Sequence, residues 1–479
     1  MIVRLRPPPG TPVLQVGAEQ RARPIPTGFI GLSIEFGALP AYAGHDPSAV
    51  DPVFEQLIRN LAPGQRPVLR IGGDSTDHTW VPVSGMSRPR GVQYSVGASW
   101  LQTAGALARA LRARVIAGIN LEADSARLAG AEGRAMLAAI GPSSLEAFEL
   151  GNEPELYGTF PWYRVDGRGV TGRPASWGIP SYIRDVSRIA HSLPRVALAT
   201  PATGDAQWIQ AIGQIAAGQP RVAVATVHRY PLHRCFTATD SPQYPTIPNL
   251  LTRASSAGLA QSVAAYAADG HARGLSVRVD ELNSVSCSGK RGVSDTFASA
   301  LWALDGAFSM ARIGVDGVNI HTFPGGIYQL FRLRHRQGLW RAGVRPEYYG
   351  LMMFAQAAPA GSRLLEVAGA PSPLLARWAT RAPNGTIHIV LINDSLHRPR
   401  YVAVAAPGTA GPAALERLRA PSVSAKHGVT LGGRSFGAQT STGRLTGRSP
   451  NYAVAPVNGK YVVRVPAASA AMLTLAPAR

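Results

Sequence analysis

Cysteine is almost absent from this chain: only Cys235 and Cys287 occur among its 479 residues. Two cysteines are too few for a disulfide-rich scaffold or for a zinc cluster built from cysteine ligands. No run of about 18 uninterrupted apolar residues occurs either. The N-terminal stretch MIVRLRPPPGTP has too short an apolar part for a signal peptide. We therefore expect no transmembrane helix, and either a cytosolic chain or one from which a leader has been removed.

Acidic residues are few, and their scarcity sets the net charge. The chain has 28 Asp and Glu against 48 Lys and Arg, a formal net charge of +20 that is carried almost wholly by arginine. A basic excess favours polyanionic partners such as an acidic polysaccharide or nucleic acid. The arginines are scattered rather than gathered in blocks, which is also the pattern of a simple compositional bias. The densest run, residues 331–345, is a candidate anion-facing loop.

Short apolar runs recur along the first three quarters of the chain, each followed by a helical pattern such as that of residues 100–113. This alternation is typical of βα units around a parallel sheet. The eight runs are 29–36, 67–73, 114–120, 145–151, 195–201, 221–228, 275–281 and 315–321. Eight repeats predict an α/β fold, a (β/α)8 TIM barrel over residues 25–358.

Beyond residues 346–358, which read as the last barrel helix, the pattern changes to alternation of apolar and polar residues. The alternating runs are 386–394, 400–407 and 460–468, with the turn signals PNGT and VNGK between them. This pattern predicts an antiparallel β-sandwich domain. Residues 11–25 also read as a strand, so we expect residues 1–24 to complete the sandwich formed by 359–479.

The predicted barrel strands end in polar residues. Catalytic groups of such barrels lie at the C-terminal strand ends, where the βα loops converge. The residues found there are Glu35, Asp74 with Ser75, Asn120, Asn152 with Glu153, His228 with Tyr230, Glu281 and His321. Glu153 and Glu281 follow the fourth and seventh strands and would face each other across the barrel mouth. Glycoside hydrolysis needs such a pair, which a retaining double displacement would place about 5 to 5.5 Å apart.

Asn152 precedes Glu153 directly, and an amide at this place can hydrogen-bond a sugar 2-hydroxyl in the oxocarbenium-like transition state. Pro154 then fixes the exit of the chain. Taken alone, the Asn-Glu-Pro tripeptide could equally be an ordinary turn.

Other polar strand ends have a second interpretation. Glu35 could be a barrel-interior charge paired with Arg70, and His228 and His321 could support the site from behind. With His233, these histidines raise the question of a metal. No two of them have the i, i+4 spacing of helical metal ligands, and glycoside hydrolysis requires no metal. We therefore expect neither a metal nor another cofactor.

Four segments resemble strand ends of glycoside hydrolase family 79, the heparanase and β-glucuronidase family, which belongs to the clan of retaining (β/α)8 glycosidases. They are LRIGGDSTDHTW (69–80), ELGNEPELYG (149–158), VHRYPLHRC (227–235) and VDELNSVSCSG (279–289). The resemblance covers roughly residues 25–355, and a trailing β-sandwich is also a feature of that family. The Asn-Glu-Pro is shared across the clan, and its combination with RIGGDSTD and ELNSVSC is more specific.

The resemblance implies a role for each matching residue. Glu153 would be the general acid/base and Glu281 the nucleophile, with Tyr230 near the nucleophile. The residues implied to bind the sugar are Glu35, Asp74, Ser75, Asn152 and His228.

In family members that take glucuronides, a tyrosine and backbone N–H groups of a loop after the nucleophile hold the substrate carboxylate, and a second tyrosine follows the eighth strand. This chain offers Ser288 and Gly289 in its loop 284–292, and Tyr328 after the eighth strand. Lys290 or Arg291 could add charge. The loop has no tyrosine of its own.

The two cysteines lie seven residues after His228 and six after Glu281, on loops that leave adjacent strands. A disulfide between Cys235 and Cys287 is therefore expected, with two buried free thiols as the alternative. In the chain-entropy model, closing a loop of about 50 residues stabilises the fold by on the order of 4 kcal/mol. A disulfide would imply an oxidising compartment, so a secreted or periplasmic location is expected, and a cytoplasmic one otherwise.

These observations predict a retaining β-glucuronidase that acts on glycosides or acidic polysaccharide. Two alternatives keep the chemistry: an endo-acting, heparanase-like hydrolase of sulfated glycosaminoglycan, and a retaining glycosidase for a xyloside or arabinoside. A polyanion-binding protein without catalysis is the alternative from another class. We expect a monomer with a carbohydrate substrate and no nucleic-acid or membrane partner.

Overall fold

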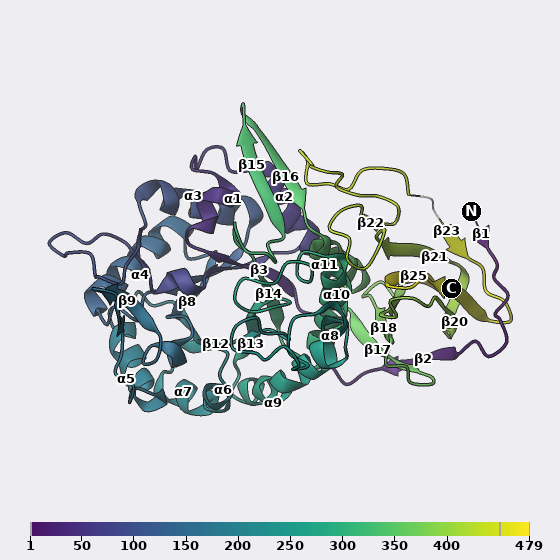
Figure 1. Ribbon diagram of the computed structural model, residues 1–479, viewed down its shortest axis with the longest axis horizontal. Coiled ribbons are helices and arrows are strands. Elements are labelled where there is room, and N and C mark those ends of the chain that lie inside the picture. The colour runs from purple at the N-terminus through teal and green to yellow at the C-terminus, as the bar shows by residue number, and fades with distance from the viewer. Residues whose placement is uncertain (1, 450–451, 479) are drawn as a thin grey trace.

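The computed structural model describes residues 2–449 and 452–478, and its larger part is a closed barrel of eight parallel strands (Figure 1). In barrel order the strands are β3 (Ile30–Glu35), β4 (Val68–Gly72), β7 (Arg114–Ile119), β8 (Leu145–Leu150), β11 (Ala197–Thr203), β12 (Val222–Arg229), β13 (Ser276–Leu282) and β14 (Gly317–His321). All five residues of β4 and of β14 are buried, as expected for strands covered on both faces. The predicted TIM barrel is confirmed.

Helices surround the barrel in a closed ring. The helices of the chain are α1 (Ala38–Ala43), α2 (Pro52–Leu61), α3 (Ala98–Leu111), α4 (Ala126–Ile140), α5 (Ile179–Ala190), α6 (Ala206–Gln210), α7 (Ile212–Gly218), α8 (Ile247–Leu250), α9 (Leu259–Ala272), α10 (Phe297–Arg312) and α11 (Pro346–Ala357). Going round the ring, α2, α3, α4, α5, α7, α9, α10 and α11 each contact the next, and α11 returns to α2. Local sequence starts these helices: Asp51 caps α2 by accepting from the Val53 N–H (2.8 Å), with Pro52 at the first helical position.

A second domain is built on one large sheet, which contains both the first and the last strand of the described chain (Figure 1). Its strands are β1 (Ile2–Val3), β2 (Val13–Glu19), β17 (Arg363–Ala368), β18 (Leu375–Arg381), β19 (Ile387–Asn393), β20 (Arg400–Ala405), β21 (Thr409–Arg419), β22 (Thr430–Leu431), β23 (Tyr452–Val454), β24 (Lys460–Val465) and β25 (Ser469–Pro477). The sheet curls so that apolar side chains of β20 and β24 share one core with those of β19 and β25.

The N-terminal strands make this sheet mixed rather than purely antiparallel. β2 pairs antiparallel with β17 on one side and parallel with β20 on the other, and β1 pairs parallel with β23. The remaining pairings are antiparallel, as the alternating pattern predicts. The N-terminal strand that the sequence predicts is therefore inserted between β17 and β20, a place in the sheet that no local pattern could reveal.

The arginine-rich run is a hairpin rather than the loop that the sequence predicted. β15 (Phe331–Arg336) and β16 (Leu339–Val344) pair antiparallel and project from the barrel (Figure 1). Arg332, Arg334 and Arg345 line a cavity of about 430 Å³ between this hairpin and the segment 426–439. This cavity is separate from the barrel mouth.

The two domains share a continuous apolar core through α10 and α11. Trp378 of β18 stacks on Phe308 of α10, with ring centroids 5.3 Å apart, and the Arg312 guanidinium lies over the indole. The indole Nε1–H donates to the buried Asp305 carboxylate (2.7 Å). No helix among the described residues combines the length and apolarity needed to cross a membrane.

Replacing Trp378 with Phe is expected to lower the free energy of unfolding by about 1–3 kcal/mol, because Asp305 loses a buried donor while most of the ring packing survives. Urea titration measures this loss. Trp340→Phe is the control: its indole stacks on His335 in the hairpin, and we expect a change within about 0.5 kcal/mol. Equal losses in the two variants would contradict the role of the Trp378–Asp305 hydrogen bond.

Candidate active site

The C-terminal ends of the barrel strands open into a cleft of about 770 Å³. The predicted site residues that line it are Asp74, Asn152, Glu153, His228, Tyr230, Glu281, Ser288, His321 and Tyr328. Glu35, Ser75 and Gly289 are not part of the lining. Glu35 and Ser75 lie behind Asp74 and are bonded to each other through the Ser75 N–H and the Glu35 Oε2 (2.9 Å).

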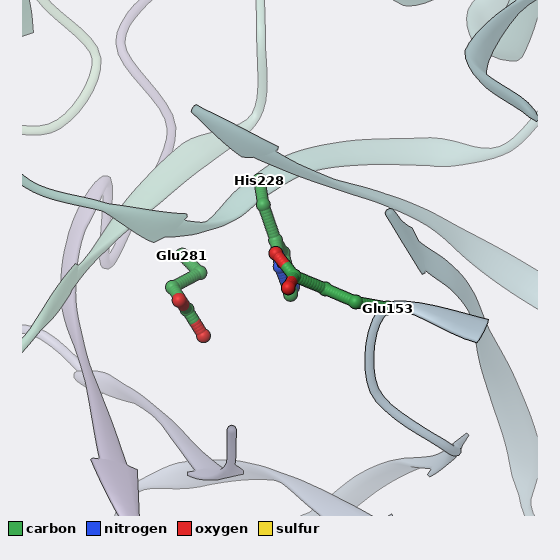
Figure 2. Close-up of side chains that lie close together, drawn as sticks. All are labelled: Glu153, His228 and Glu281. Atoms are coloured by element: carbon green, nitrogen blue, oxygen red, sulfur yellow. The ribbon is translucent and has the colours of Figure 1, made fainter. Parts of the chain in front are cut away.

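Glu153 reaches the cleft because the chain turns sharply where β8 ends. Gly151 has a φ of 79°, and a Cβ there would strike the Tyr157 hydroxyl. Glu153 itself has a φ of 45°, and Pro154 begins a short 3-10 turn. The Glu153 side chain is 27% exposed, and its Oε1 accepts a hydrogen bond from His228 Nδ1 (3.0 Å). Figure 2 shows Glu153 extending from its strand end toward His228, with Glu281 alongside.

Glu281, at the end of β13, is held as an ion. Its Oε1 accepts from the Tyr230 hydroxyl (2.7 Å) and its Oε2 from Arg70 Nη1 (2.8 Å). Burial alone would raise the pKa of Glu281, but the cations of His321, His228 and Arg70 and the Tyr230 hydrogen bond hold it well below its usual range. A carboxylate that is ionised and fixed in place suits a nucleophile.

The two carboxylates lie close together. One oxygen of Glu153, one oxygen of Glu281 and a ring nitrogen of His228 are all within 4.8 Å of one another. This separation fits the roughly 5 to 5.5 Å of a retaining glycosidase better than the wider gap that an inverting enzyme needs for its water. Three such groups could also surround a metal ion, but His228 Nδ1 is occupied as a donor to Glu153 and both Glu281 oxygens already accept hydrogen bonds.

The Arg70 guanidinium lies at the bottom of the site and is fully buried. Its Nε donates to Glu149 (2.6 Å), its Nη1 to Glu281 (2.8 Å), and its Nη2 to the Asn152 Oδ1 (2.7 Å). Arg70 thereby links β8, the fourth barrel strand, to β13, the seventh. Burial and the neighbouring Glu149 raise the pKa of Asp280, so this nearby carboxyl is neutral and adds no further negative charge.

Two histidines flank the pair. Burial opposes charge on His228, yet the Glu281 carboxylate and the bond to Glu153 raise the pKa of His228 to about 10. It is therefore an imidazolium that donates to Glu153. His321 lies 3.6 Å from the Glu281 Oε2 through Nδ1 and 3.3 Å from the Glu35 Oε1 through Nε2. The interpretation of Glu35 as a partner of Arg70 is wrong: its cationic neighbour is His321, because Arg70 turns toward Glu149 and Glu281.

Asn152 and Asp74 form the floor of the cleft beside Glu153. The Asn152 Nδ2 donates to the Asp74 Oδ1 (3.2 Å). Asp74 is exposed to the cleft, and desolvation by the surrounding protein together with the Glu35, Glu153 and Glu281 carboxylates raises the pKa of Asp74 to about 7. Asp74 can therefore either donate to or accept from a ligand hydroxyl near neutral pH.

The loop after Glu281 closes one side of the cleft. Cys287 and Ser288 have left-handed φ values of 57° and 66°, followed by Gly289 at 86°. The Ser288 carbonyl accepts from the Ile327 N–H (2.7 Å), which brings Tyr328 to the cleft, where its ring stacks on Tyr230. The predicted Cys235–Cys287 disulfide is present, with a Cα separation of 6.3 Å.

The sequence reading missed one structural residue of this site. Asp77 is buried and accepts from the Asn152 N–H (2.9 Å) and the Tyr157 hydroxyl (2.6 Å), and so fixes the turn that presents Glu153. The sequence feature that could have indicated Asp77 is its position in the RIGGDSTD segment, three residues after Asp74. Phe160, Trp162 and Phe236, which form the outer wall of the cleft, were also missed. Trp162 lies in the short strand β9 (Pro161–Val165), and Phe160 and Phe236 lie in loops, none of them within a recognisable pattern.

Comparison with known proteins connects this geometry to a family. Residues 382–472 match the family model for the glycosyl hydrolase family 79 C-terminal beta domain. A beta-glucuronidase of Neurospora crassa is 25% identical over 440 residues, covering 79% of this chain and 74% of that protein. A beta-glucuronidase of Aspergillus niger is 23% identical over 514 residues, covering 95% and 92%.

Solved structures share the fold. A 4-O-alpha-L-rhamnosyl-beta-D-glucuronidase from Fusarium oxysporum 12S superposes with a TM-score of 0.75 at 20% identity, covering 97% of this chain and all of that one. A GH51 arabinofuranosidase from Xanthomonas axonopodis pv. citri gives a TM-score of 0.67 at 14% identity, again over 97% of this chain and all of the other.

The barrel, the carboxylate pair at its mouth and the appended β-domain define a (β/α)8 glycoside hydrolase. Its C-terminal region matches the family 79 C-terminal beta domain, and the chain is similar to the two fungal beta-glucuronidases over most of its length. Its substrate is therefore a carbohydrate.

Arg70→Met is expected to lower the free energy of unfolding by about 3–5 kcal/mol at neutral pH, because Glu149 and Glu281 remain as buried charges without their cation. The deficit should shrink as the pH falls and these carboxylates take up protons. Thermal unfolding between pH 3 and 7 measures both effects. Arg114→Met is the control, since Arg114 pairs with Glu146 at a partly exposed site and should cost about 1 kcal/mol or less. A pH-independent deficit would contradict this account of Arg70.

Proposed function

We propose that the chain is a retaining β-glucuronidase in which Glu281 is the nucleophile and Glu153 the general acid/base. The observation that carries the proposal is the asymmetry of the pair: Glu281 is buried, ionised and bonded to Arg70 and Tyr230, while Glu153 is more open to the cleft. The names of the two fungal relatives and the substrate named for the Fusarium structure support a glucuronide as the sugar.

In the first step Glu281 attacks the anomeric carbon while Glu153 protonates the departing oxygen. His228 donates to the Glu153 Oε1, which leaves Oε2 free to carry the transferred proton. Asn152 lies next to Glu153, where its amide can bond the sugar 2-hydroxyl as positive charge develops on the ring. In the second step Glu153, now a carboxylate, removes a proton from water, which hydrolyses the glycosyl-enzyme ester with overall retention.

Recognition of the uronate carboxylate is assigned to the loop after the nucleophile. Cys287, Ser288 and Gly289 have successive left-handed conformations, and consecutive N–H groups in such turns form concave sites for anions. The Ser288 side chain and the Tyr328 ring line the same part of the cleft. Gly289 contributes least, since its N–H already contacts the Ser286 carbonyl at 3.4 Å.

Two further assignments follow from the same residues. The Cys235–Cys287 disulfide supports an oxidising compartment, either secreted or periplasmic. A monomer is the proposed working form, because Glu153, Glu281 and their bonded partners meet within a single barrel. An endo-acting enzyme is the second candidate, favoured by the arginine-lined cavity at the β15–β16 hairpin, which could hold a distant part of an acidic polysaccharide.

A screen of 4-nitrophenyl β-glycosides tests the sugar. We expect the β-glucuronide to have the highest kcat/KM, with the glucoside and xyloside at least about tenfold lower, because removing the carboxylate leaves the donors of the loop after Glu281 and of Tyr328 without their acceptor. Proton NMR of the early product should show the β-anomer. A xyloside or arabinoside that outruns the glucuronide would disprove the sugar assignment, and an initial α-product would disprove retention.

The two glutamates are expected to respond differently to amide substitution. Glu281→Gln should lower kcat by at least about 10⁴-fold on every substrate, since no nucleophile remains. Glu153→Gln should lose about 10²- to 10⁴-fold on an alkyl glucuronide, and much less on a 2,4-dinitrophenyl glucuronide, whose leaving group needs no proton. Steady-state kinetics on the two substrates provide the measurement. The reverse pattern would exchange the roles of the two residues.

A further inference from the structure

Two exposed phenylalanines stand at the outer wall of the cleft. Phe236 is 91% exposed and Phe160 is 48% exposed, although burial of such rings is strongly favourable. Their rings meet edge to face, with centroids 6.3 Å apart and planes at 69°. Both residues line the same cleft as Glu153 and Glu281. Apolar surface that is left open beside a catalytic pair is available to a ligand.

The wall that carries Phe160 begins directly after the proposed acid. Phe160 follows Glu153 closely in the chain. Its N–H donates to the Leu156 carbonyl (2.9 Å), which fixes the backbone between the two residues. Trp162 anchors this wall by donating from Nε1 to the Asp77 carbonyl (2.9 Å). Asp77 also fixes the turn that presents Glu153, so the wall and the acid share one support.

The wall that carries Phe236 is tied to the loop after the nucleophile. The Cys235–Cys287 disulfide immediately precedes Phe236, and the Ser286 N–H donates to the Leu232 carbonyl (2.9 Å). Lys290 lies over the ring of Tyr244, 3.9 Å from its centroid, and adds a third link between the two loops. Phe236 has a left-handed φ of 64°, which bulky residues rarely adopt. The ring is thus held outward by fixed backbone rather than by packing beneath it.

The position of the pair relative to the chemistry identifies its ligand. The acid must touch the oxygen between the cleaved sugar and the leaving group, so the leaving group lies on the outer side of Glu153. The sugar itself would occupy the inner part of the cleft, near Glu281, Tyr328 and His321. Phe160 and Phe236 are on the remaining, outer side, next to the chain that follows Glu153.

We propose that Phe160 and Phe236 form an aglycone-binding platform, on which the leaving group packs the flat apolar face of a ring. The inference rests on the proposed function, because it takes Glu153 as the acid. Such a face is offered by an aryl group and by the C–H face of a second sugar ring. The platform would favour both over a small alkyl leaving group. The two phenylalanines would contact only the leaving group and not the sugar that is cleaved off.

The test compares methyl β-glucuronide with 2-phenylethyl β-glucuronide, whose alcohols have similar acidity, so that the ratio of their kcat/KM values reports the aglycone contact alone. Phe236→Ala and Phe160→Ala are each expected to lower the phenylethyl-to-methyl ratio by about threefold to tenfold. Leu339→Ala is the matched control: it removes an exposed apolar side chain from the β15–β16 hairpin and should leave the ratio unchanged. An unchanged ratio in both phenylalanine variants, together with an unchanged kcat/KM on a disaccharide substrate, would overturn the platform.

A disaccharide with glucuronic acid β-linked to a neutral sugar forms the second arm. A drop confined to the disaccharide identifies a sugar ring as the occupant, and a drop confined to the phenylethyl compound identifies an aryl group. If wild type cleaves no glucuronide, the proposed function fails on its own. Ligand-observed NMR of 2-phenylethanol then decides the platform: weaker binding to the Phe160→Ala/Phe236→Ala variant supports it, and equal binding overturns it.

Discussion

One buried guanidinium organises the mouth of the barrel. Arg70 bonds Glu149 and Asn152 on the fourth strand side and Glu281 on the seventh, so one planar cation sets the spacing of the strands that carry the two catalytic candidates. A buried cation needs anions around it, and the nucleophile candidate is one of them. The charge that stabilises the fold here is therefore the same charge that keeps Glu281 ionised.

The polar groups around Arg70 continue this pairing of charges toward the cleft. Three cations, Arg70, His228 and His321, surround Glu281, and the carboxyl of Asp280 is kept neutral. Glu153 lies at the edge of the cluster, bonded through one oxygen to His228 and open to the cleft. Two glutamates of one type thus acquire different environments, which is the physical basis for assigning them different roles.

Rigidity of the loops links the site to the outer cleft. Asp77 supports both the turn of Glu153 and the wall of Phe160, while the disulfide joins the wall of Phe236 to the loop after Glu281. In each half of the cleft, one support therefore holds both a catalytic candidate at the inner end and an aromatic ring at the outer end. Asp77 and the disulfide thus support both the residues proposed for catalysis and the rings proposed to contact the leaving group.

The sequence by itself determined the eight barrel strands, the alternating strands of the second domain and the polar strand ends, since hydrophobic periodicity and strand-end chemistry are local. It also placed Glu153, Glu281 and both cysteines. Only the tertiary structure decided that β2 enters the sheet between β17 and β20, that Glu35 meets His321 instead of Arg70, and that Phe160 meets Phe236. These depend on contacts between segments far apart in the chain, where side-chain direction and competition among several charges select the partner.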